Sequence, residues 1–198
     1  MIKEFQRIGR ELARMNLISS HSGNLSVRMG DRILITRRGC MLADLQEEDL
    51  VETALEEVDS GVILASSELV VHREVYKETS ALAIVHCHPP FATALSLSRD
   101  EIVPLDSEGS YLLHKVPVIA TEKTIGSQEV AKVLPKYLKE YKIVMLRGHG
   151  SFATGQMLEE ALMWSSTLEA SARIIAIAEG LGEKIKEYRR KSEEYSRW

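Results

Sequence analysis

Cysteine is scarce in this sequence, since Cys40 and Cys87 are the only two among 198 residues. Two cysteines are too few for the disulfide framework of a small secreted protein, and they fit a reducing compartment. No apolar run approaches the roughly 20 residues that a membrane-spanning helix needs, and the first residues lack the apolar segment of a signal peptide. These absences argue against the disulfide-stabilised and membrane-spanning classes, and we expect a cytoplasmic protein.

The sequence also lacks an excess of basic residues and any repeated or low-complexity segment. Its 25 Lys and Arg residues are outnumbered by 29 Asp and Glu residues, which gives a formal net charge of −4. A global basic field that would attract nucleic acid or an anionic membrane is therefore missing. Since there is no linker-like segment either, we expect residues 1–198 to form a single domain, with the strongly charged residues 182–198 as a C-terminal tail.

What the sequence does contain is a hydrophobic pattern that alternates between helical and strand periods. It predicts helices over residues 2–16, 68–78, 90–97, 127–140 and 157–180. It predicts strands over residues 25–28, 32–36, 81–85, 116–120 and 142–146. The first two strands would be joined by a hairpin turn. Since both short turns and helices connect the strands, we expect an α/β protein with a mixed, largely antiparallel central sheet and helices on its faces.

Two histidines, His86 and His88, stand at the end of the predicted strand 81–85, just before two prolines. Side chains two residues apart leave the same face of a strand, so both imidazoles point one way and Cys87 points the other. Two neutral imidazoles that converge provide half of a divalent metal site. The alternative is a pair of polar residues that bond to backbone or water at a strand end.

Further ligands could come from His149, which has a glycine on either side, and from Glu68 at the first turn of a predicted helix. His149 follows the predicted strand 142–146, so a neighbouring strand could bring it beside the histidine pair. By itself, His149 could also be an exposed turn residue, and Glu68 could serve only the helix dipole. His72 lies on the same helical face as Glu68 and could hydrogen-bond its carboxylate, or be an ordinary half-buried histidine.

Three segments of small or basic residues could hold a phosphate. They are Ser22, Gly23 and Asn24, then Arg38 and Gly39, and finally Ser66 and Ser67. The first segment offers hydroxyl, amide and backbone N–H donors, and the second a guanidinium beside a glycine turn. The third precedes a helix, whose free N–H groups and dipole favour an anion. Each segment could also be an ordinary turn or cap, and none matches a P-loop or a dinucleotide-binding fingerprint.

These motifs follow one another in a fixed order: Ser-Gly-Asn-Leu-Ser-Val, Ile-Thr-x-x-Gly, Ser-Ser-Glu-x-x-x-His, His-x-His-Pro and Gly-His-Gly. In this combination, over residues 1–180, the sequence resembles the class II aldolase/adducin family, and within it the L-fuculose-phosphate aldolases. The resemblance implies a single three-layer α-β-α domain. It also implies that His86, His88 and His149 hold a Zn²⁺ ion, or another divalent transition metal, with Glu68 as ligand and base.

The reaction implied by the resemblance is the reversible cleavage of a ketose 1-phosphate, similar to L-fuculose 1-phosphate, into dihydroxyacetone phosphate and a small aldehyde. In the direction of addition to the aldehyde, Glu68 would remove a proton from the carbon of dihydroxyacetone phosphate beside the carbonyl, and the metal would stabilise the resulting enediolate as a Lewis acid. The three small-residue segments would hold the substrate phosphate. The family also implies a homotetramer with active sites at the subunit interfaces.

The proton donor of this family has no clear counterpart. The fuculose-phosphate aldolases use a tyrosine from a neighbouring subunit, and an ungapped reading from Pro104 places Glu108 at that point, three residues before Tyr111. Glu108 and Tyr111 are both candidates for the catalytic acid. The aromatic residues that the family carries near its C-terminus have only loose counterparts in Tyr188, Tyr195 and Trp198.

Three other functions remain open within this resemblance: a pentulose-phosphate 4-epimerase, a methylthioribulose-phosphate dehydratase and a non-catalytic adducin-like binding module. The epimerases typically carry an aspartate where Glu68 stands, so the longer carboxylate favours the aldolase. A binding module has no need for three metal-binding histidines together with Glu68, which argues against that alternative.

Overall fold

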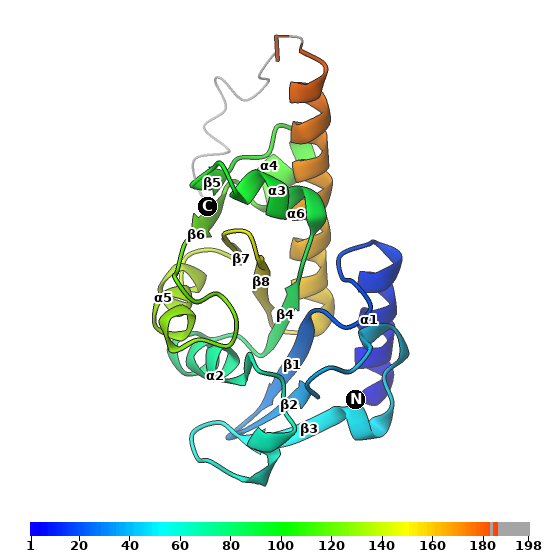
Figure 1. The fold of residues 1–198 in the computed structure, drawn as a ribbon, viewed down its shortest axis with the longest axis vertical. Coiled ribbons are helices and arrows are strands. Elements are labelled where there is room, and N and C mark those ends of the chain that lie inside the picture. Colours follow the sequence, from blue (N-terminus) through cyan, green and yellow to red (C-terminus); the bar gives the residue numbers. More distant parts are fainter. Residues whose placement is uncertain (183, 186–198) are drawn as a thin grey trace.

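An eight-stranded sheet forms the centre of the computed structural model, which describes residues 1–182, 184 and 185 (Figure 1). The strands are β1 (Asn24–Met29), β2 (Arg32–Thr36), β3 (Leu50–Ala54), β4 (Ala83–Cys87), β5 (Glu101–Ile102), β6 (Val116–Ile119), β7 (Ile143–Leu146) and β8 (Gly150–Gly155). Their order is β3-β2-β1-β4-β8-β7-β6-β5, and only β6 and β7 pair in parallel. The predicted mixed, largely antiparallel sheet is confirmed.

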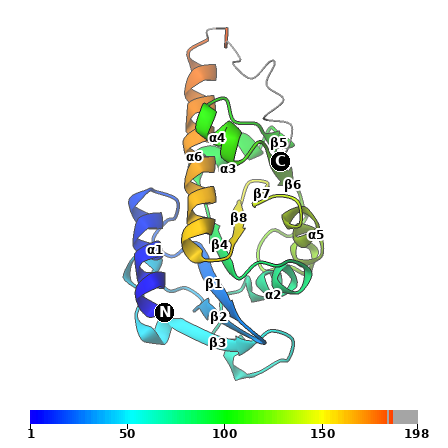
Figure 2. The same ribbon diagram turned by 180° about the vertical axis from the view of Figure 1, so that it is seen from behind.

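Helices cover both faces of the sheet, as Figures 1 and 2 show from opposite sides. They are α1 (Ile2–Arg14), α2 (Leu69–Glu78), α3 (Pro90–Ser96), α4 (Ser107–Leu112), α5 (Gln128–Leu138) and α6 (Leu158–Gly180). One hydrophobic cluster joins the sheet to α2 and α5, and a second joins it to α1, α3 and α6. This is the predicted three-layer α-β-α arrangement. None of the described helices combines the length and apolar character that crossing a bilayer requires.

Strand β4 lies near the middle of the sheet, between β1 and β8, and all five of its residues are buried. Its side chains alternate between the two clusters because successive residues of a strand point to opposite faces. Val85 and Cys87 belong to the cluster on the α6 side, whereas Ile84 belongs to the cluster on the side of α2 and α5. His86, two residues after Ile84, points to the same side of the sheet as Ile84. Cys87 points to the opposite side, as predicted.

The predicted helices and strands are present with ends shifted by a few residues, but β3, β5, β8 and α4 were not predicted. Strand β8 reads Gly-Ser-Phe-Ala-Thr-Gly, with one large apolar residue and a glycine at each end. It pairs with β7 across a short turn and with β4, a strand distant in sequence, and all six of its residues are buried. The predicted tail, residues 182–198, lies almost wholly outside the described residues, and so do Tyr188, Tyr195 and Trp198.

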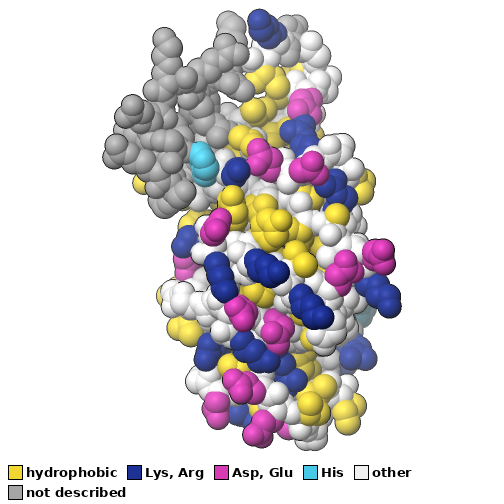
Figure 3. Space-filling view, turned by 90° about the vertical axis from the view of Figure 1, so that its left-hand side faces the viewer, with side chains coloured by type: hydrophobic (Ala, Val, Ile, Leu, Met, Phe, Trp, Pro, Cys, Tyr) yellow, Lys and Arg dark blue, Asp and Glu magenta, His cyan; other side chains and the backbone are white. Residues whose placement is uncertain are grey.

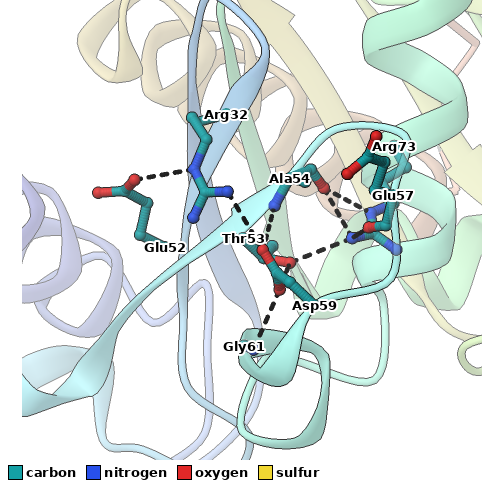
Figure 4. A network of polar contacts seen from close by, with 8 residues as sticks. All are labelled: Arg32, Glu52, Thr53, Ala54, Glu57, Asp59, Gly61 and Arg73. Atoms are coloured by element: carbon teal, nitrogen blue, oxygen red, sulfur yellow. Dashed lines mark hydrogen bonds and ion pairs between the residues drawn. The ribbon is translucent and has the colours of Figure 1, made fainter.

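The segment between β3 and α2 is held by a polar network (Figure 4). The carboxylate of Asp59 accepts hydrogen bonds from the Thr53 hydroxyl (2.6 Å) and the Ala54 N–H (2.8 Å). From α2, the guanidinium of Arg73 donates to the backbone oxygens of Ala54 (2.6 Å) and Glu57 (2.9 Å). Hydrogen bonds from a charged donor to backbone oxygens contribute more than neutral ones. This network therefore anchors the chain that leads into α2.

The face formed by α2 and α5 is the one that Figure 3 presents. Lys and Arg side chains are interspersed there with Asp and Glu side chains, and the described part of this face shows no patch of one sign. Interspersed charges of both signs largely cancel one another's field beyond about 10 Å at 0.1 M salt. The net charge of −4 is thus not concentrated on this face.

Candidate metal centre

Three histidines meet at one end of the central strands. His86 is the fourth residue of β4, His88 follows β4 directly, and His149 lies in the turn between β7 and β8. The pairing of β4 with β8, with Cys87 opposite Ser151, brings that turn beside the end of β4. The ring centroids of each of the three pairs are 4.9 Å apart. One possible ligand atom from each ring lies within 4.8 Å of the other two.

The orientation of His86 is set by the backbone of β8. Its Nδ1 lies 2.9 Å from the carbonyl oxygen of Ser151, so Nδ1 carries the proton and donates it. This leaves the lone pair on Nε2, which lies 3.1 Å from Nε2 of His88. A hydrogen bond that fixes the tautomer in this way commonly supports a metal-binding imidazole. The ring of Phe152 is stacked on His86 at 4.1 Å and keeps it in place.

The distances fit a divalent ion with nitrogen ligands. Two nitrogens bound to one tetrahedral Zn²⁺ at about 2.0–2.1 Å lie roughly 3.4 Å apart, close to the separation of the His86 and His88 nitrogens. Nδ1 of His149 is buried and has no hydrogen-bond partner among the described residues. A buried polar atom without a partner is unfavourable, and a metal ion would satisfy it. The donor set therefore fits a zinc-like ion.

Burial keeps the three imidazoles neutral. It lowers the pKa of His86 well below its usual value, with the neighbouring histidines adding to the effect. It lowers the pKa of His88 to about 4, again helped by His149. The pKa of His149 is also lowered by burial, and the backbone of Thr124 opposes part of that shift. Since only the neutral ring offers a lone pair, the site is ready to bind a metal at neutral pH.

Glu68 directly precedes α2, and it is linked to the cluster through the 124–126 segment, where it contacts Gly126 and His149 contacts the backbone of Thr124. Its side chain is buried, with 2% of the residue exposed, and its Oε1 accepts a hydrogen bond from the Gly126 N–H at 2.9 Å. Oε2 is buried and has no hydrogen-bond partner within the described part of the chain. Burial raises the pKa of Glu68, although the bond from Gly126 opposes this. The group of converging ligand atoms consists of the three histidines and does not include Glu68.

His72 does not make the hydrogen bond to Glu68 that its helical position suggested. Its Nδ1 lies 2.6 Å from the hydroxyl of Ser26, which in turn lies 2.7 Å from the hydroxyl of Tyr76. A residue four positions along a helix shares the face of Glu68, but here the neighbouring strand β1 supplies a closer partner. His72 still lies behind the metal centre, because its ring meets the edge of Phe152 at 6.1 Å.

His72 should make the metal-free protein less stable below neutral pH. It is fully buried, and burial lowers its pKa to about 3. In the unfolded chain a histidine takes up a proton near pH 6.5, so stability is lost as pH falls below that value. Between pH 7 and pH 5 this one residue costs about 2 kcal/mol. We expect the loss, measured by urea unfolding at both pH values, to be smaller by that amount in His72→Asn.

His72→Asn retains a group that can hydrogen-bond Ser26, and the other histidines contribute equally to both proteins. The difference between them therefore isolates His72. The same pH dependence in variant and parent would contradict the assignment of His72 as a buried neutral residue.

Two of the predicted phosphate-binding segments lie side by side. The Ser66 N–H donates to the carbonyl oxygen of Thr36 (3.1 Å), and the Arg38 N–H donates to that of Leu64 (3.0 Å). Gly39 has a φ of +68°, which glycine adopts without strain, so the chain turns there directly after Arg38. The exposed Arg38 and the backbone before α2 are thus brought to the same place by tertiary hydrogen bonds.

The remaining segment lies against the histidines. Asn24 pairs with His86 across β1 and β4, and its Oδ1 is buried without a hydrogen-bond partner in the described chain. Gly23 has a φ of +80°, and a Cβ at that position would come within 2.8 Å of the His86 carbonyl oxygen. Only glycine allows this close approach. The hydroxyl of Ser22 accepts a hydrogen bond from the Ser19 N–H at 2.8 Å and still has its own proton to donate.

The two candidate proton donors are placed elsewhere. Glu108 and Tyr111 both lie on α4, which packs against α6 on the other side of the sheet from Glu68. Tyr111 is 59% exposed. Among the described residues, the histidine group includes neither Glu108 nor His21 and His114, and the latter two were not predicted as ligands.

Three contributors to the centre were missed from the sequence. Ser151 orients His86 through its carbonyl oxygen, Gly126 holds Glu68 through its N–H, and Phe152 stacks on His86. Two of these act through backbone atoms, which every residue type shares. Only Phe152 carried a signal, as the one large apolar residue after Gly-His-Gly.

Comparison with known proteins agrees with this geometry. A family model described as "Class II Aldolase and Adducin N-terminal domain" matches residues 3–176. An L-fuculose phosphate aldolase of Methanocaldococcus jannaschii is 31% identical, over 87% of this chain and 93% of that protein. A 5-methylthioribulose-1-phosphate/5-deoxyribulose-1-phosphate aldolase of Rhodospirillum rubrum is 31% identical, over 86% of this chain and 79% of that protein. The crystal structure of an L-fuculose-1-phosphate aldolase from Thermus thermophilus superposes with a TM-score of 0.87 and 40% identity, over 93% of this chain and 97% of that one.

Proposed function

Because this chain belongs to the class II aldolase and adducin family, we propose that it is a metal-dependent aldolase that cleaves a ketose 1-phosphate. The products are dihydroxyacetone phosphate and a small aldehyde, and the reaction is reversible. One observation carries this proposal: His86, His88 and His149 converge, and the buried, partly unpaired Glu68 contacts the same 124–126 segment as His149. A non-catalytic binding module has no use for that combination.

The three histidines would hold a Zn²⁺ ion or a similar divalent transition metal. Neutral imidazoles bind several such ions with comparable geometry, so the donor set does not select zinc alone. When bound, the ion would act as a Lewis acid on the carbonyl of the ketose. The chain's own contribution is to present three lone pairs in fixed positions, with His86 oriented by Ser151 and stacked on Phe152.

In the condensation direction, Glu68 is the base that removes a proton from the carbon of dihydroxyacetone phosphate beside the carbonyl. In the cleavage direction, it returns that proton to the same carbon after the carbon–carbon bond has broken. Burial raises its pKa, which makes the carboxylate a stronger base than one in water. The bond from Gly126 holds one oxygen still and leaves Oε2 for the substrate. The family resemblance also suggested Glu68 as a metal ligand. In the conformation described, its carboxylate stands outside the ligand group, which suits a base better than a ligand.

The substrate phosphate would be held by the three segments, since Ser66 bonds to Thr36 and the Leu25 N–H donates to the Thr36 hydroxyl at 3.1 Å. The side chain of Asn24 carries an NH₂ group that could donate to the phosphate, and Arg38 supplies a positive charge that is exposed to solvent. The N–H groups beside Ser66 and Ser67 at the start of α2 favour an anion. Together these groups would fix the phosphate end of the substrate, so that the reacting carbon lies near Glu68.

The proton for the aldehyde oxygen would come from a second copy of the chain. Glu108 and Tyr111 lie on α4, in the layer on the other side of the sheet from Glu68, and Tyr111 is 59% exposed at the surface. We therefore propose a homotetramer with active sites at the subunit interfaces, located in the cytoplasm. The mass in solution tests the assembly, since it should be four times that of the 22.2 kDa chain.

The second candidate function uses the same site, but acts on a different substrate or breaks a different bond. The Rhodospirillum rubrum relative is named as an aldolase of 5-methylthioribulose 1-phosphate and 5-deoxyribulose 1-phosphate. A dehydratase of methylthioribulose phosphate and a pentulose-phosphate 4-epimerase would use the same metal and carboxylate. Glu68, in place of the aspartate typical of the epimerases, favours the aldolase.

The decisive experiment is a product assay on protein reloaded with Zn²⁺. L-Fuculose 1-phosphate and 5-methylthioribulose 1-phosphate are supplied separately, and dihydroxyacetone phosphate is measured by an enzyme-coupled assay. We expect it to form from at least one of them and to stop forming after metal removal by a chelator. A product that keeps all the carbons of the substrate would instead identify a dehydratase or an epimerase. Failure to bind any divalent ion would remove the enzyme proposal.

A further inference from the structure

We propose that Ser96 is a positioning residue of the metal centre, which sets His149 in place relative to His88 and never touches the metal. This inference rests on the proposed metal-dependent function. Ser96 is the last residue of α3, and α3 begins two residues after His88. The helix therefore connects one metal-binding histidine with the turn that carries another. Ser96 is completely buried.

The hydroxyl of Ser96 joins α3 to the turn between β7 and β8. Its proton is donated to the carbonyl oxygen of Thr93 at 2.7 Å, and its oxygen accepts the N–H of Gly148 at 2.9 Å. Gly148 directly precedes His149 and has a φ of +67°, so the direction of its N–H is set by a conformation that other residues adopt with strain. The hydroxyl thus holds the peptide next to His149.

A second tie runs between the same two elements. The guanidinium of Arg147 donates to the carbonyl oxygen of Ser96 at 2.7 Å and also binds the carboxylate of Asp100 at 2.6 Å. Two consecutive residues of the turn, Arg147 and Gly148, are therefore both bonded to Ser96. A turn held at two adjacent points has little freedom to rotate the side chain that follows.

The opposite end of α3 is fixed by Glu169 from α6. Its carboxylate accepts the N–H groups of Phe91 (3.1 Å) and Ala92 (3.0 Å), and it is 3% exposed. Arg173, one turn further along α6, lies over the ring of Phe91 at 5.3 Å. Since Glu169 holds the start of α3 near His88 independently of Ser96, loss of the Ser96 hydroxyl should move the turn that carries His149 more than it moves His88.

Removal of the Ser96 hydroxyl should lower the affinity of the protein for the metal ion. Partners that orient ligands typically change metal affinity by about 10–100-fold when they are removed. In Ser96→Ala the Gly148 N–H loses its acceptor, and the turn can move away from α3. We expect the dissociation constant for Zn²⁺, measured by competition with a chromophoric chelator, to rise by about 10–100-fold. The visible spectrum of the Co²⁺-loaded protein should change as well, because it reports the arrangement of the ligands.

Two further substitutions separate positioning from general destabilisation. Ser96→Thr keeps the hydroxyl and should bind Zn²⁺ within about threefold of the parent, which is under 1 kcal/mol. Ser98→Ala is the matched control, since Ser98 lies just beyond the same helix end, is exposed, and among the described residues its hydroxyl bonds to the carbonyl oxygen of Leu95. It should leave both the Zn²⁺ affinity and the Co²⁺ spectrum unchanged.

Two results would contradict the proposal. An unchanged Zn²⁺ affinity and Co²⁺ spectrum in folded Ser96→Ala would overturn it, as would an equal loss in Ser98→Ala. If Ser96→Ala does not fold, Arg147→Met decides, because it removes the second tie from a partly exposed position and should also weaken binding. The parent protein is measured first: if it binds no metal at one ion per chain, the proposed function itself fails. If the parent protein binds one metal ion per chain and the variants bind it with the same affinity, only the role of Ser96 is refuted.

Discussion

His88→Ala should remove stoichiometric metal binding and, with it, the cleavage of the ketose phosphate. His88 contributes one of three converging imidazoles, and its Nε2 lies 3.1 Å from that of His86. Two nitrogens without the third leave the ion with half of a tetrahedral site. Lewis-acid activation by a metal is worth several kcal/mol, and each 1.36 kcal/mol is tenfold in rate, so we expect kcat to fall by roughly a thousandfold or more. Metal content by mass spectrometry and the product assay measure both effects.

The matched control for this prediction is His114→Asn. His114 lies between α4 and β6, outside the ligand group, and has a φ of +57° that asparagine tolerates. It should retain one ion per chain and the activity of the parent. His88→Ala protein with a full complement of metal would show that the three histidines are not the binding site.

Glu68→Gln should keep the metal and lose proton abstraction. Glutamine has nearly the same shape as glutamate, and its carbonyl oxygen can still accept the Gly126 N–H that now bonds Oε1. It has no basic oxygen to take a proton from carbon. Since general-base catalysis contributes about 10²–10⁴-fold, the exchange of deuterium from D₂O into dihydroxyacetone phosphate, followed by NMR, should slow by that factor. Zn²⁺ affinity should change by only a few-fold, because the three histidines remain.

Glu78→Gln provides the control on the same helix. Glu78 lies at the other end of α2, where it pairs with Lys139 on the surface at 2.6 Å. Its replacement should affect neither exchange nor metal content. Exchange at the parent rate in Glu68→Gln would disprove the assignment of the base. A parallel loss of metal would show that Glu68 is a ligand as well.

The sequence predicted most of the site because its chemistry depends on rare side chains. Histidines two residues apart on a strand must share a face, and His86 and His88 do so. The convergence of His149 on this pair was an expectation that the structure supports through the β4–β8 pairing. Of the two alternatives for His72, the structure shows no hydrogen bond to Glu68: His72 is a fully buried histidine whose partner, Ser26, lies on a strand far away in sequence.

Backbone donors and acceptors account for much of what could not be predicted. The carbonyl of Ser151 fixes a tautomer, and the N–H of Gly126 fixes a carboxylate, yet every residue carries such groups. Ser96 was not noticed for a related reason. A serine in a short helix is ordinary, and its role becomes visible only when the Gly148 turn is placed against it.

By itself, the sequence determined the fold class, the family and the three histidines that could bind a metal. Period-two and period-3.6 patterns are local, and ordered motifs with histidine, glutamate and glycine are specific enough to read along the chain. Only the tertiary structure decided that the three histidines converge, that Glu68 is buried against Gly126, and that Glu108 and Tyr111 lie in another layer. The physical reason is that these positions depend on contacts between segments distant in sequence, in which strand register and backbone hydrogen bonds fix the geometry.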